Sequence, residues 1–260
     1  MSISYSELLL LGTLAGFTIF LGLPLVYMPR VGHKAKSFLN VFSAGVLIFL
    51  LYEIIEEVLE EIGGAWRSGE TGEASGFAIL FLICLAVGLG GLLLYEKMYI
   101  RTDKNAAAKT TGASLALMIA IGIGLHNFGE GLAIGQAFIQ GSMILAVTLV
   151  VGFGLHNATE GFGIVAPLSG DKPKLGYVAL LGLIGGGPTF LGTLVGSFIA
   201  SELLEIIFLS LASGSILYVV VKLLQLQYKL RDFEMAAAGA VCGFLLAWAG
   251  EWVTKLSMGS

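Results

Sequence analysis

Charged residues are scarce in this chain. Only 12% of its 260 residues are Asp, Glu, Lys or Arg, whereas 57% are hydrophobic. A soluble domain carries about 25% charged residues, so this composition excludes an ordinary soluble protein. Positive charge is not in excess, because the formal net charge is −4. We therefore expect no nucleic-acid partner, since proteins that bind nucleic acids rely on a basic surface.

Cysteine and long polar linkers are also nearly absent. Cys84 and Cys242 each lie inside an apolar run, where an unpaired cysteine behaves as a small hydrophobic residue. We therefore expect no disulfide framework. The connectors between the apolar runs are short, and none is long enough to form a further soluble domain. A single domain over residues 1–260 is the expectation.

Long apolar runs are what the sequence does contain. A helix needs about 20 largely apolar residues to cross a bilayer, and eight segments satisfy this length. Because only helices or closed barrels span lipid, and these runs are too long for barrel strands, we predict an all-α integral membrane protein with eight transmembrane helices. The predicted spans are residues 7–28, 37–59, 76–98, 112–136, 142–166, 176–199, 203–224 and 234–255.

The basic residues predict the orientation of these spans. With eight spans, the loops 1–2, 3–4, 5–6 and 7–8 lie on the same side of the membrane. Twelve of the 14 Lys and Arg residues fall on that side. Positive charge marks the cytoplasmic side, so both termini are expected outside, in a plasma or inner membrane. The twelve residues are Arg30, Lys34, Lys36, Lys97, Arg101, Lys104, Lys109, Lys172, Lys174, Lys222, Lys229 and Arg231.

Acidic residues gather on the opposite, outer side. The stretch "YEIIEEVLEEI" (52–62) carries glutamates along one helical stripe and apolar residues largely opposite, which predicts an amphipathic extension of span two. Two further glutamates stand at the outer start of span seven. We predict a cation-collecting entrance here, and the alternative is an ordinary solvated helix face. The entrance residues would be Glu53, Glu56, Glu57, Glu202 and Glu205.

Two internal repeats organise the spans. "GIGLHNFGEG" (122–131) in span four matches "GFGLHNATEG" (152–161) in span five. "LLGTLAGFTIFLG" (10–22) aligns more weakly with "LLGLIGGGPTFLG" (180–192), and span two resembles span seven. Spans five apart point in opposite directions, so we predict a 3+2+3 arrangement in which spans 1–3 and 6–8 are inverted repeats around spans 4–5. Such repeats are typical of transporters, with the site near the bilayer midplane.

The motif pair predicts a metal site. Residues four apart share one face of a helix, so His126 points with Glu130, and His156 points with Glu160. A buried carboxylate in a bilayer is costly, and one divalent cation would neutralise two of them. Imidazole with carboxylate suits Zn²⁺ above all, with Fe²⁺, Mn²⁺, Co²⁺ or Cd²⁺ as alternatives. A second ion could use Asn127 and Asn157, with the glutamates bridging. Interhelical hydrogen bonding alone would need neither two copies nor two buried carboxylates.

These motifs resemble the paired metal-binding motifs of the ZIP (Zrt/Irt-like protein) metal-ion transporters, nearest to their prokaryotic GufA-like branch. The resemblance extends over the eight spans and the repeats. It implies import of divalent transition-metal ions as substrate, with no prosthetic group, through a binuclear site between spans four and five. It also implies an elevator-like motion of a transport bundle against a dimerising scaffold, and therefore a homodimer. The implied ligands are His126, Asn127, Glu130, His156, Asn157 and Glu160.

Three positions depart from the pattern of that branch. Gly129 and Thr159 stand where it usually has proline, and Gly187 stands before Pro188 where it commonly has a glutamate in span six. The last departure removes an expected ligand and leaves open whether one or two ions bind. His33, in the first cytoplasmic loop, is a candidate to receive the exiting ion, and the alternative is a plain loop residue.

An intramembrane metal-dependent hydrolase is the alternative function. It would need an open coordination position together with a catalytic acid or base. The spans contain no third histidine and no extra acid beside the motif, and hydrolysis does not require inverted repeats. The sequence therefore favours a transporter rather than an enzyme.

Overall fold

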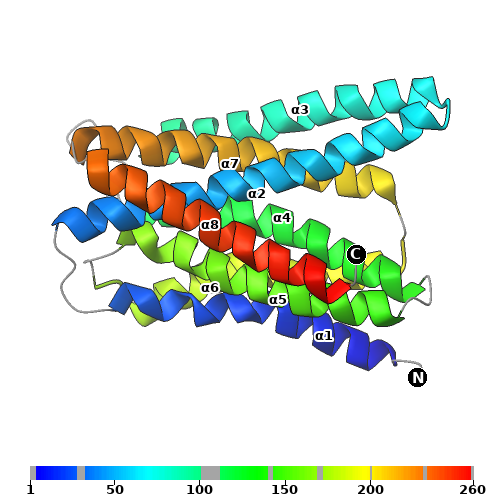
Figure 1. Ribbon diagram of the computed structural model, residues 1–260, viewed down its shortest axis with the longest axis horizontal. Coiled ribbons are helices and arrows are strands. Elements are labelled where there is room, and N and C mark those ends of the chain that lie inside the picture. The colour runs from blue at the N-terminus through cyan, green and yellow to red at the C-terminus, as the bar shows by residue number, and fades with distance from the viewer. Residues whose placement is uncertain are drawn as a thin grey trace.

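Helices form every regular element in the part of the chain that the structure describes. The computed structural model describes residues 4–27, 33–100, 112–139, 143–168, 172–199, 201–230 and 233–258. Eight α-helices run back and forth along the long axis of the molecule (Figure 1). They are α1 (Tyr5–Phe17), α2 (His33–Arg67), α3 (Thr71–Tyr95), α4 (Gly112–Ile139), α5 (Met143–Val165), α6 (Leu175–Gly196), α7 (Glu202–Leu230) and α8 (Phe233–Met258).

The helices agree with the predicted spans in number and order. Within the described part of the chain, seven segments are long and apolar enough to cross a membrane. The segment predicted at 142–166 is present as α5 but is not one of those seven. The chain is therefore an all-helical, multi-pass membrane protein. Helix α2 continues to Arg67, past the predicted end at residue 59, because the glutamate-rich stretch prolongs the helix.

The first span has a regular helix that is much shorter than predicted. Ser4 and Glu7 form a capping box at its start, in which the Glu7 amide donates to Ser4 Oγ at 3.3 Å and the Ser4 amide donates to the Glu7 carboxylate at 2.7 Å. Helix α1 ends at Phe17, and the chain continues through two 3₁₀ turns, Thr18–Leu21 and Leu23–Tyr27. Pro24 lacks the N–H that a continuous α-helix would use there.

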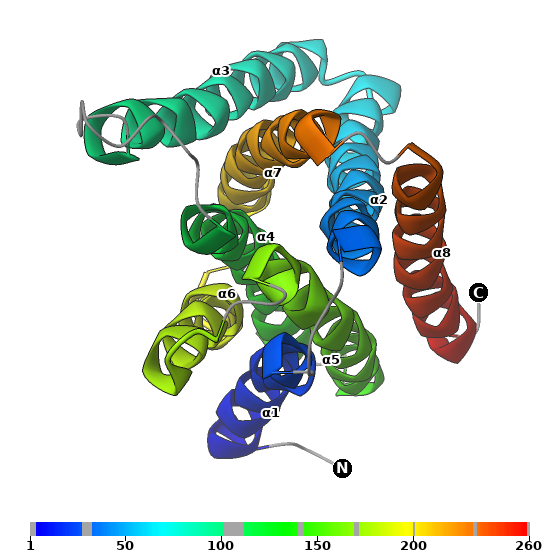
Figure 2. The same ribbon diagram turned by 90° about the vertical axis from the view of Figure 1, so that its left-hand side faces the viewer.

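The helices form two groups, which Figure 2 shows in end view. One group, called here the motif bundle, contains α1, α4, α5 and α6, in which α6 packs against both α1 and α4. The other, the flanking bundle, contains α2, α3, α7 and α8, in which α2 packs against α8 and α3 against α7. Across the boundary, α4 packs against α7, and α5 packs against α2 and α8. The motif-bearing helices therefore face both groups.

Glycines hold each bundle together through direct backbone contact. In the motif bundle, a Cβ added to Gly16 would overlap the Gly186 carbonyl oxygen, and a Cβ added to Gly186 would overlap that of Gly16. In the flanking bundle, a Cβ on Gly214 would overlap the carbonyl oxygen of Leu85, and one on Gly243 that of Phe42. Such close approach is the use that membrane helices make of small residues.

The boundary between the bundles is looser. Three glycines face across it, and a Cβ on each would first meet a side chain. The nearest atoms are Ile216 Cγ1 at 3.4 Å from Gly122, Leu209 Cδ2 at 3.0 Å from Gly129, and Ser43 Oγ at 3.7 Å from Gly163. Side chains rather than backbones therefore separate the two bundles where these glycines lie.

Large apolar side chains fill the boundary toward the end of the molecule opposite the termini. Leu47 of α2, Ile119 of α4, Ile164 of α5 and Val219 of α7 belong to one cluster, and none is more than 1% exposed. One polar contact crosses this region, from Ser43 Oγ to the Gly163 carbonyl oxygen at 2.8 Å. This half of the boundary is consequently apolar and closely packed.

One pair of charges differs from its predicted setting. Lys222 was expected with the connecting loops, but α7 continues to Leu230 and places it inside the helix. Its ammonium group lies 2.6 Å from the carboxylate of Glu96, which is 4% exposed. Tyr218 donates a further hydrogen bond to Glu96. These groups join α7 to the π-helical turn that follows α3, so they are an internal contact of the flanking bundle.

Candidate metal centre

The motif residues lie at mid-helix in α4 and α5, inside the protein. Asn127, Asn157 and Glu160 are completely buried, and His126 and Glu130 are at most 5% exposed. Burial follows from the glycines around them, because Gly124 and Gly131 bring α4 into backbone contact with α6, and Gly161 brings α5 onto Ile19. The side chain of His156 lies outside the described residues, although its backbone is part of α5.

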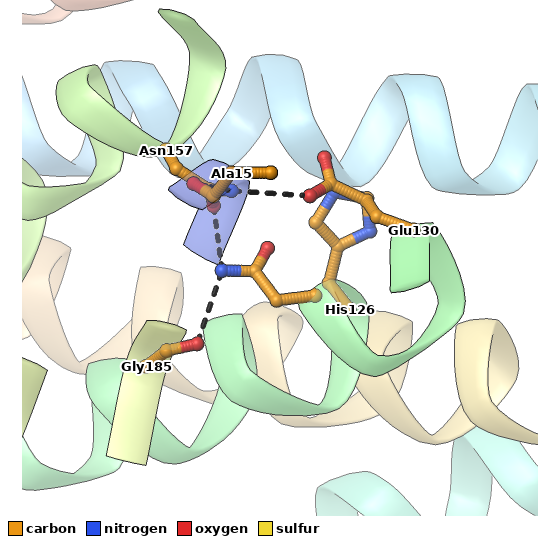
Figure 3. A network of polar contacts seen from close by, with 6 residues as sticks. Ala15, His126, Glu130, Asn157 and Gly185 are labelled. Carbon is orange, nitrogen blue, oxygen red and sulfur yellow. Dashed lines mark hydrogen bonds and ion pairs between the residues drawn. The ribbon is translucent and has the colours of Figure 1, made fainter. Parts of the chain in front are cut away.

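His126 and Glu130 face each other across one helical turn. His126 Nε2 lies 3.4 Å from Glu130 Oε1, and Figure 3 shows the imidazole beside the carboxylate. The spacing of four residues predicted this pairing. The pair offers one imidazole nitrogen and one carboxylate side by side, which are ligands that Zn²⁺ and its neighbours accept.

The two motif asparagines join α4 to α5 and also to the outer helices of the motif bundle. Asn127 Nδ2 donates to Asn157 Oδ1 at 2.6 Å and to the Gly185 carbonyl oxygen at 3.0 Å. Asn157 Nδ2 donates to the Ala15 carbonyl oxygen at 3.2 Å and to Glu130 Oε2 at 3.4 Å (Figure 3). The network fixes both amides and orients the Glu130 carboxylate, so four helices define one small polar volume.

Glu160 adds a second buried carboxylate to this region. A buried ionised group is costly unless an opposite charge or a metal balances it, and α4 and α5 contribute no Lys or Arg within their described ranges. Among the side chains that the structure describes, no three His, Cys, Asp or Glu residues come together as a metal-binding group. The predicted ligand set includes His156, whose side chain is not among them.

Helix α6 presents two residues to this volume. Gly185 does so through its carbonyl oxygen, and Thr189, one turn further, is completely buried. Gly187 lies on a different face of α6, on the same stripe as the half-exposed Leu183 and Leu191, and no atom lies within 4 Å of where its Cβ would be. A side chain at position 187 would point away from the motif residues in this structure. Thr189 was missed because nothing in its sequence context distinguishes it.

The predicted entrance residues divide between two faces of α2. Glu57 is half-buried, hydrogen-bonds to Glu205 of α7, and lies close enough to His126 and Glu53 to interact electrostatically with both. Glu56 instead accepts a hydrogen bond from Tyr52 Oη at 2.9 Å. The outward-facing cleft that these two residues line, of about 510 Å³, also contains Glu60 and Arg67. Glu202 is exposed at the start of α7. Only part of the stripe therefore faces the motif.

The candidate exit residue can be placed only by its backbone. His33 is the first residue of α2, at the end of the molecule opposite the termini. Its side chain lies outside the described residues.

A comparison with protein families agrees with this site. A family model described as the ZIP zinc transporter matches residues 100–249, which contain α4 to α7, most of α8 and both motif copies. A search of curated proteins finds no match. The match is to the family as a whole, so the GufA-like branch stays a prediction. Buried paired motifs, an all-helical membrane fold and a match over more than half of its length together show that the chain belongs to the ZIP zinc transporter family, whose members transport divalent metal ions across membranes.

Proposed function

We propose that the protein imports divalent transition-metal ions into the cytoplasm, with Zn²⁺ as the principal substrate. The observation that carries this proposal is the hydrogen bond between Asn127 and Asn157. It holds the two motif copies against each other within the membrane-spanning bundle. Two sets of imidazole and carboxylate ligands can then act on one ion.

The proposed zinc ligands are His126 and Glu130 of α4 with His156 and Glu160 of α5. Zinc in proteins is most often four-coordinate, with nitrogen, sulfur or carboxylate ligands. The pairing of His126 with Glu130 at 3.4 Å supports the first half of this set. The burial of Glu160, at 0% exposure, supports the second, because a cation would offset its charge. The ion is cargo, so the site must also release it.

We propose that α1–α3 and α6–α8 are inverted repeats around α4 and α5. Gly16 and Gly186, which the sequence alignment pairs, contact each other backbone to backbone. The asparagines donate to Ala15 and Gly185, which are paired by the same alignment. Equivalent residues that touch, or that accept equivalent bonds, are expected near a two-fold axis. The α2–α8 and α3–α7 contacts also exchange under this relationship.

Alternating access would arise from movement of the motif bundle against the flanking bundle. The backbone contacts of glycines support two rigid bodies, and the side-chain contacts of Gly122, Gly129 and Gly163 support a boundary that can slide. The apolar cluster around Leu47 and Ile119 closes one half of that boundary. The ion would therefore leave only after the boundary has moved.

The proposed route enters at Glu57 and Glu205, which lie at the end of the molecule that carries both termini. The electrostatic contact of Glu57 with His126 connects this entrance to the site. Glu53 lies beside Glu57, whereas Glu56 and Glu202 would act only through the general negative potential of this end. The exit would pass His33. We also propose that both termini face outward from a plasma or inner membrane. Residues 1–260 would form one domain, and two copies would form a homodimer.

A metal-dependent hydrolase is not favoured. Members of the ZIP family are transporters. Glu57 interacts electrostatically with His126, and the proposal assigns it, with Glu205, to ion entry rather than to acid–base catalysis.

The test is zinc flux into proteoliposomes that enclose a zinc-sensitive dye. Wild-type protein should give flux in proportion to the amount reconstituted. Glu130→Gln and Glu160→Gln should each lower it by more than about 100-fold, since even partners of metal ligands contribute 10- to 100-fold. Glu70→Gln, at an exposed position, is the matched control and should leave flux unchanged. A wild-type preparation that binds zinc but gives no flux would overturn the proposal.

A further inference from the structure

Ser43 is a buried helical serine whose hydroxyl bonds to a different helix. Serine side chains inside helices commonly donate to the carbonyl oxygen four residues earlier in the same helix. Ser75, Ser210 and Ser213 do so in this protein. Ser43 Oγ, at 0% exposure, instead donates to the Gly163 carbonyl oxygen of α5 at 2.8 Å. This hydrogen bond therefore connects the flanking bundle to the motif bundle.

Pro167 explains why the Gly163 carbonyl oxygen takes a donor from outside its own helix. In an α-helix this oxygen would accept from the N–H four residues later, but residue 167 is a proline and has no N–H. Helix α5 ends at Val165, and the chain continues as a 3₁₀ turn, Ala166–Leu168. Ser43 supplies the donor that proline removes from the end of α5.

Both ends of this hydrogen bond are held by backbone contacts. Next to Ser43, the carbonyl oxygen of Phe42 lies against α8, where a Cβ on Gly243 would overlap it. In α5, a Cβ on Gly161 would overlap the carbonyl oxygen of Ile19, in the turn that follows α1. The bond therefore joins two firmly packed parts of the molecule, and a displacement of one bundle along the other would break it.

Apolar side chains surround the bond. Leu47, one turn from Ser43 in α2, and Ile164, next to Gly163, are completely buried in the apolar cluster of the boundary. The 3₁₀ turn packs on α2 and α4, and its first and last residues are at most 3% exposed. Gly163 is itself buried, so water would not replace the Ser43 hydroxyl while the boundary is closed. A buried carbonyl oxygen that loses its donor is costly.

We propose that Ser43 and Pro167 form a latch that holds the two bundles in the arrangement seen here, with the half of the boundary opposite the termini closed. The inference rests on the proposed function, because it concerns the proposed movement of the bundles. Pro167 leaves the Gly163 carbonyl oxygen in need of a donor. Ser43 provides that donor only in the closed arrangement, and water provides it once the boundary opens. One hydrogen bond thus sets part of the balance between the two arrangements.

The experiment measures the distance between the bundles with two spin labels on the full-length protein in lipid nanodiscs. Leu175→Cys in α6 and Tyr228→Cys in α7 place one label on an exposed position of each bundle, in a background with Cys84→Ala and Cys242→Ala. Double electron–electron resonance gives the ratio of open to closed populations. Ser43→Ala should raise that ratio by about fivefold or more, since the carbonyl oxygen loses a donor only in the closed arrangement.

Two further variants keep the test decisive. Pro167→Ala restores the missing N–H, so α5 can satisfy the Gly163 carbonyl oxygen itself. In that background, Ser43→Ala should change the ratio by less than about twofold, because the two positions are coupled through one acceptor. Ser210→Ala is the matched control. It removes a buried hydroxyl that bonds within its own helix, and should leave the ratio as in the wild type.

The possible outcomes separate the latch from a merely structural role of Ser43, which would lower the unfolding midpoint without moving the ratio. An unchanged or lowered ratio in Ser43→Ala would overturn the inference. An equal shift in Ser210→Ala, or a full effect of Ser43→Ala in the Pro167→Ala background, would also overturn it. The distance measurement needs neither metal nor transport. An absence of zinc flux in the wild type would overturn the proposed function alone.

Discussion

Asn127 and Asn157 occupy the same place in two copies of one motif, and they are hydrogen-bonded to each other at 2.6 Å. The bond closes the α4–α5 interface at the level of the candidate ligands. Because each asparagine also donates to a backbone carbonyl, on Gly185 or Ala15, the pair is fixed from both sides. On the proposed function, a cation that enters this volume would meet a rigid frame.

The proposed movement of one bundle against the other predicts that a covalent link across the boundary stops transport. The Cβ position of Gly122 lies 3.6 Å from Ser215 Cβ, which falls within the separation that disulfides need. In a background with Cys84→Ala and Cys242→Ala, oxidised Gly122→Cys/Ser215→Cys protein should lose zinc flux and regain it on reduction. Zinc binding, measured by calorimetry, should persist in both states.

A link inside the motif bundle is the control for that experiment. The Cβ position of Gly154 lies 3.4 Å from Thr18 Cγ2, and both residues belong to parts of the chain expected to move together. Oxidised Thr18→Cys/Gly154→Cys protein should transport at the reduced rate. If the cross-boundary link leaves flux intact while it is shown to form, the two-body movement is wrong.

Gly186 and Gly187 are neighbours in α6 with opposite surroundings. A methyl group on Gly186 would overlap the Gly16 carbonyl oxygen, whereas one on Gly187 meets open space. Gly186→Ala should therefore destabilise the protein by about 1–3 kcal/mol through overpacking. Gly187→Ala should be neutral or stabilising by up to about 1 kcal/mol, because alanine favours a helix. Thermal unfolding in detergent, followed by circular dichroism, distinguishes them, and equal effects would contradict the packing described.

Glu57 and Glu205 should matter for zinc capture more than the other acidic residues of α2. Replacing either residue, as Glu57→Gln or Glu205→Gln, removes one of the two hydrogen-bonded carboxyl groups, whose oxygen atoms could hold an entering cation beside His126. The KM for zinc flux should rise several-fold, on the order of 3 to 10, with kcat little changed. Glu60→Gln alters an exposed residue of the outward-facing cleft and is the matched control. A KM that responds to Glu60→Gln as strongly as to Glu57→Gln would count against a defined entrance.

Lys222 should be structurally necessary although it is far from the motif. Lys222→Met leaves the buried Glu96 carboxylate without its ammonium partner at 2.6 Å. Removing one member of a buried pair costs about 3–5 kcal/mol, so the unfolding midpoint in detergent should fall clearly. The double variant Lys222→Met/Glu96→Gln should recover most of the loss. Lys97→Met removes an exposed lysine next to Glu96 and should leave the unfolding midpoint unchanged. If the double variant does not recover stability, the unpaired Glu96 carboxylate is not the cause of the loss.

The sequence was sufficient where local periodicity and duplication decide the structure. The spacing of His126 and Glu130 on one helix predicted their contact, and the twin motif predicted that α4 and α5 meet through these faces. Apolar runs predicted the helices, and the glutamate-rich stretch predicted that α2 extends beyond its apolar span. The end of the first span was wrong, because α1 stops before the 3₁₀ turns that contain Pro24. These features depend on residues close together in the chain.

Features that depend on distant partners could not be predicted. The hydrogen bond from Asn127 to the Gly185 carbonyl oxygen joins α4 to α6, and no local pattern in either helix predicts it. The rotation of α2 decides that Glu57 faces α7 while Glu56 faces outward, and an acidic stripe does not encode that rotation. Lys222 looked like a loop charge because its partner, Glu96, lies 126 positions away along the chain.

The backbone contacts of glycine have a consequence for how such a protein can evolve. Helices that touch through their main chains have few side chains to rearrange, so the frame around the proposed ion site would keep its shape during the proposed motion of the motif bundle. On the proposed motion, substitutions among the ligands then change which ion is accepted, and substitutions along the side-chain boundary change how fast it is delivered. Selectivity and speed would be adjustable separately, by residues on different surfaces of the same helices.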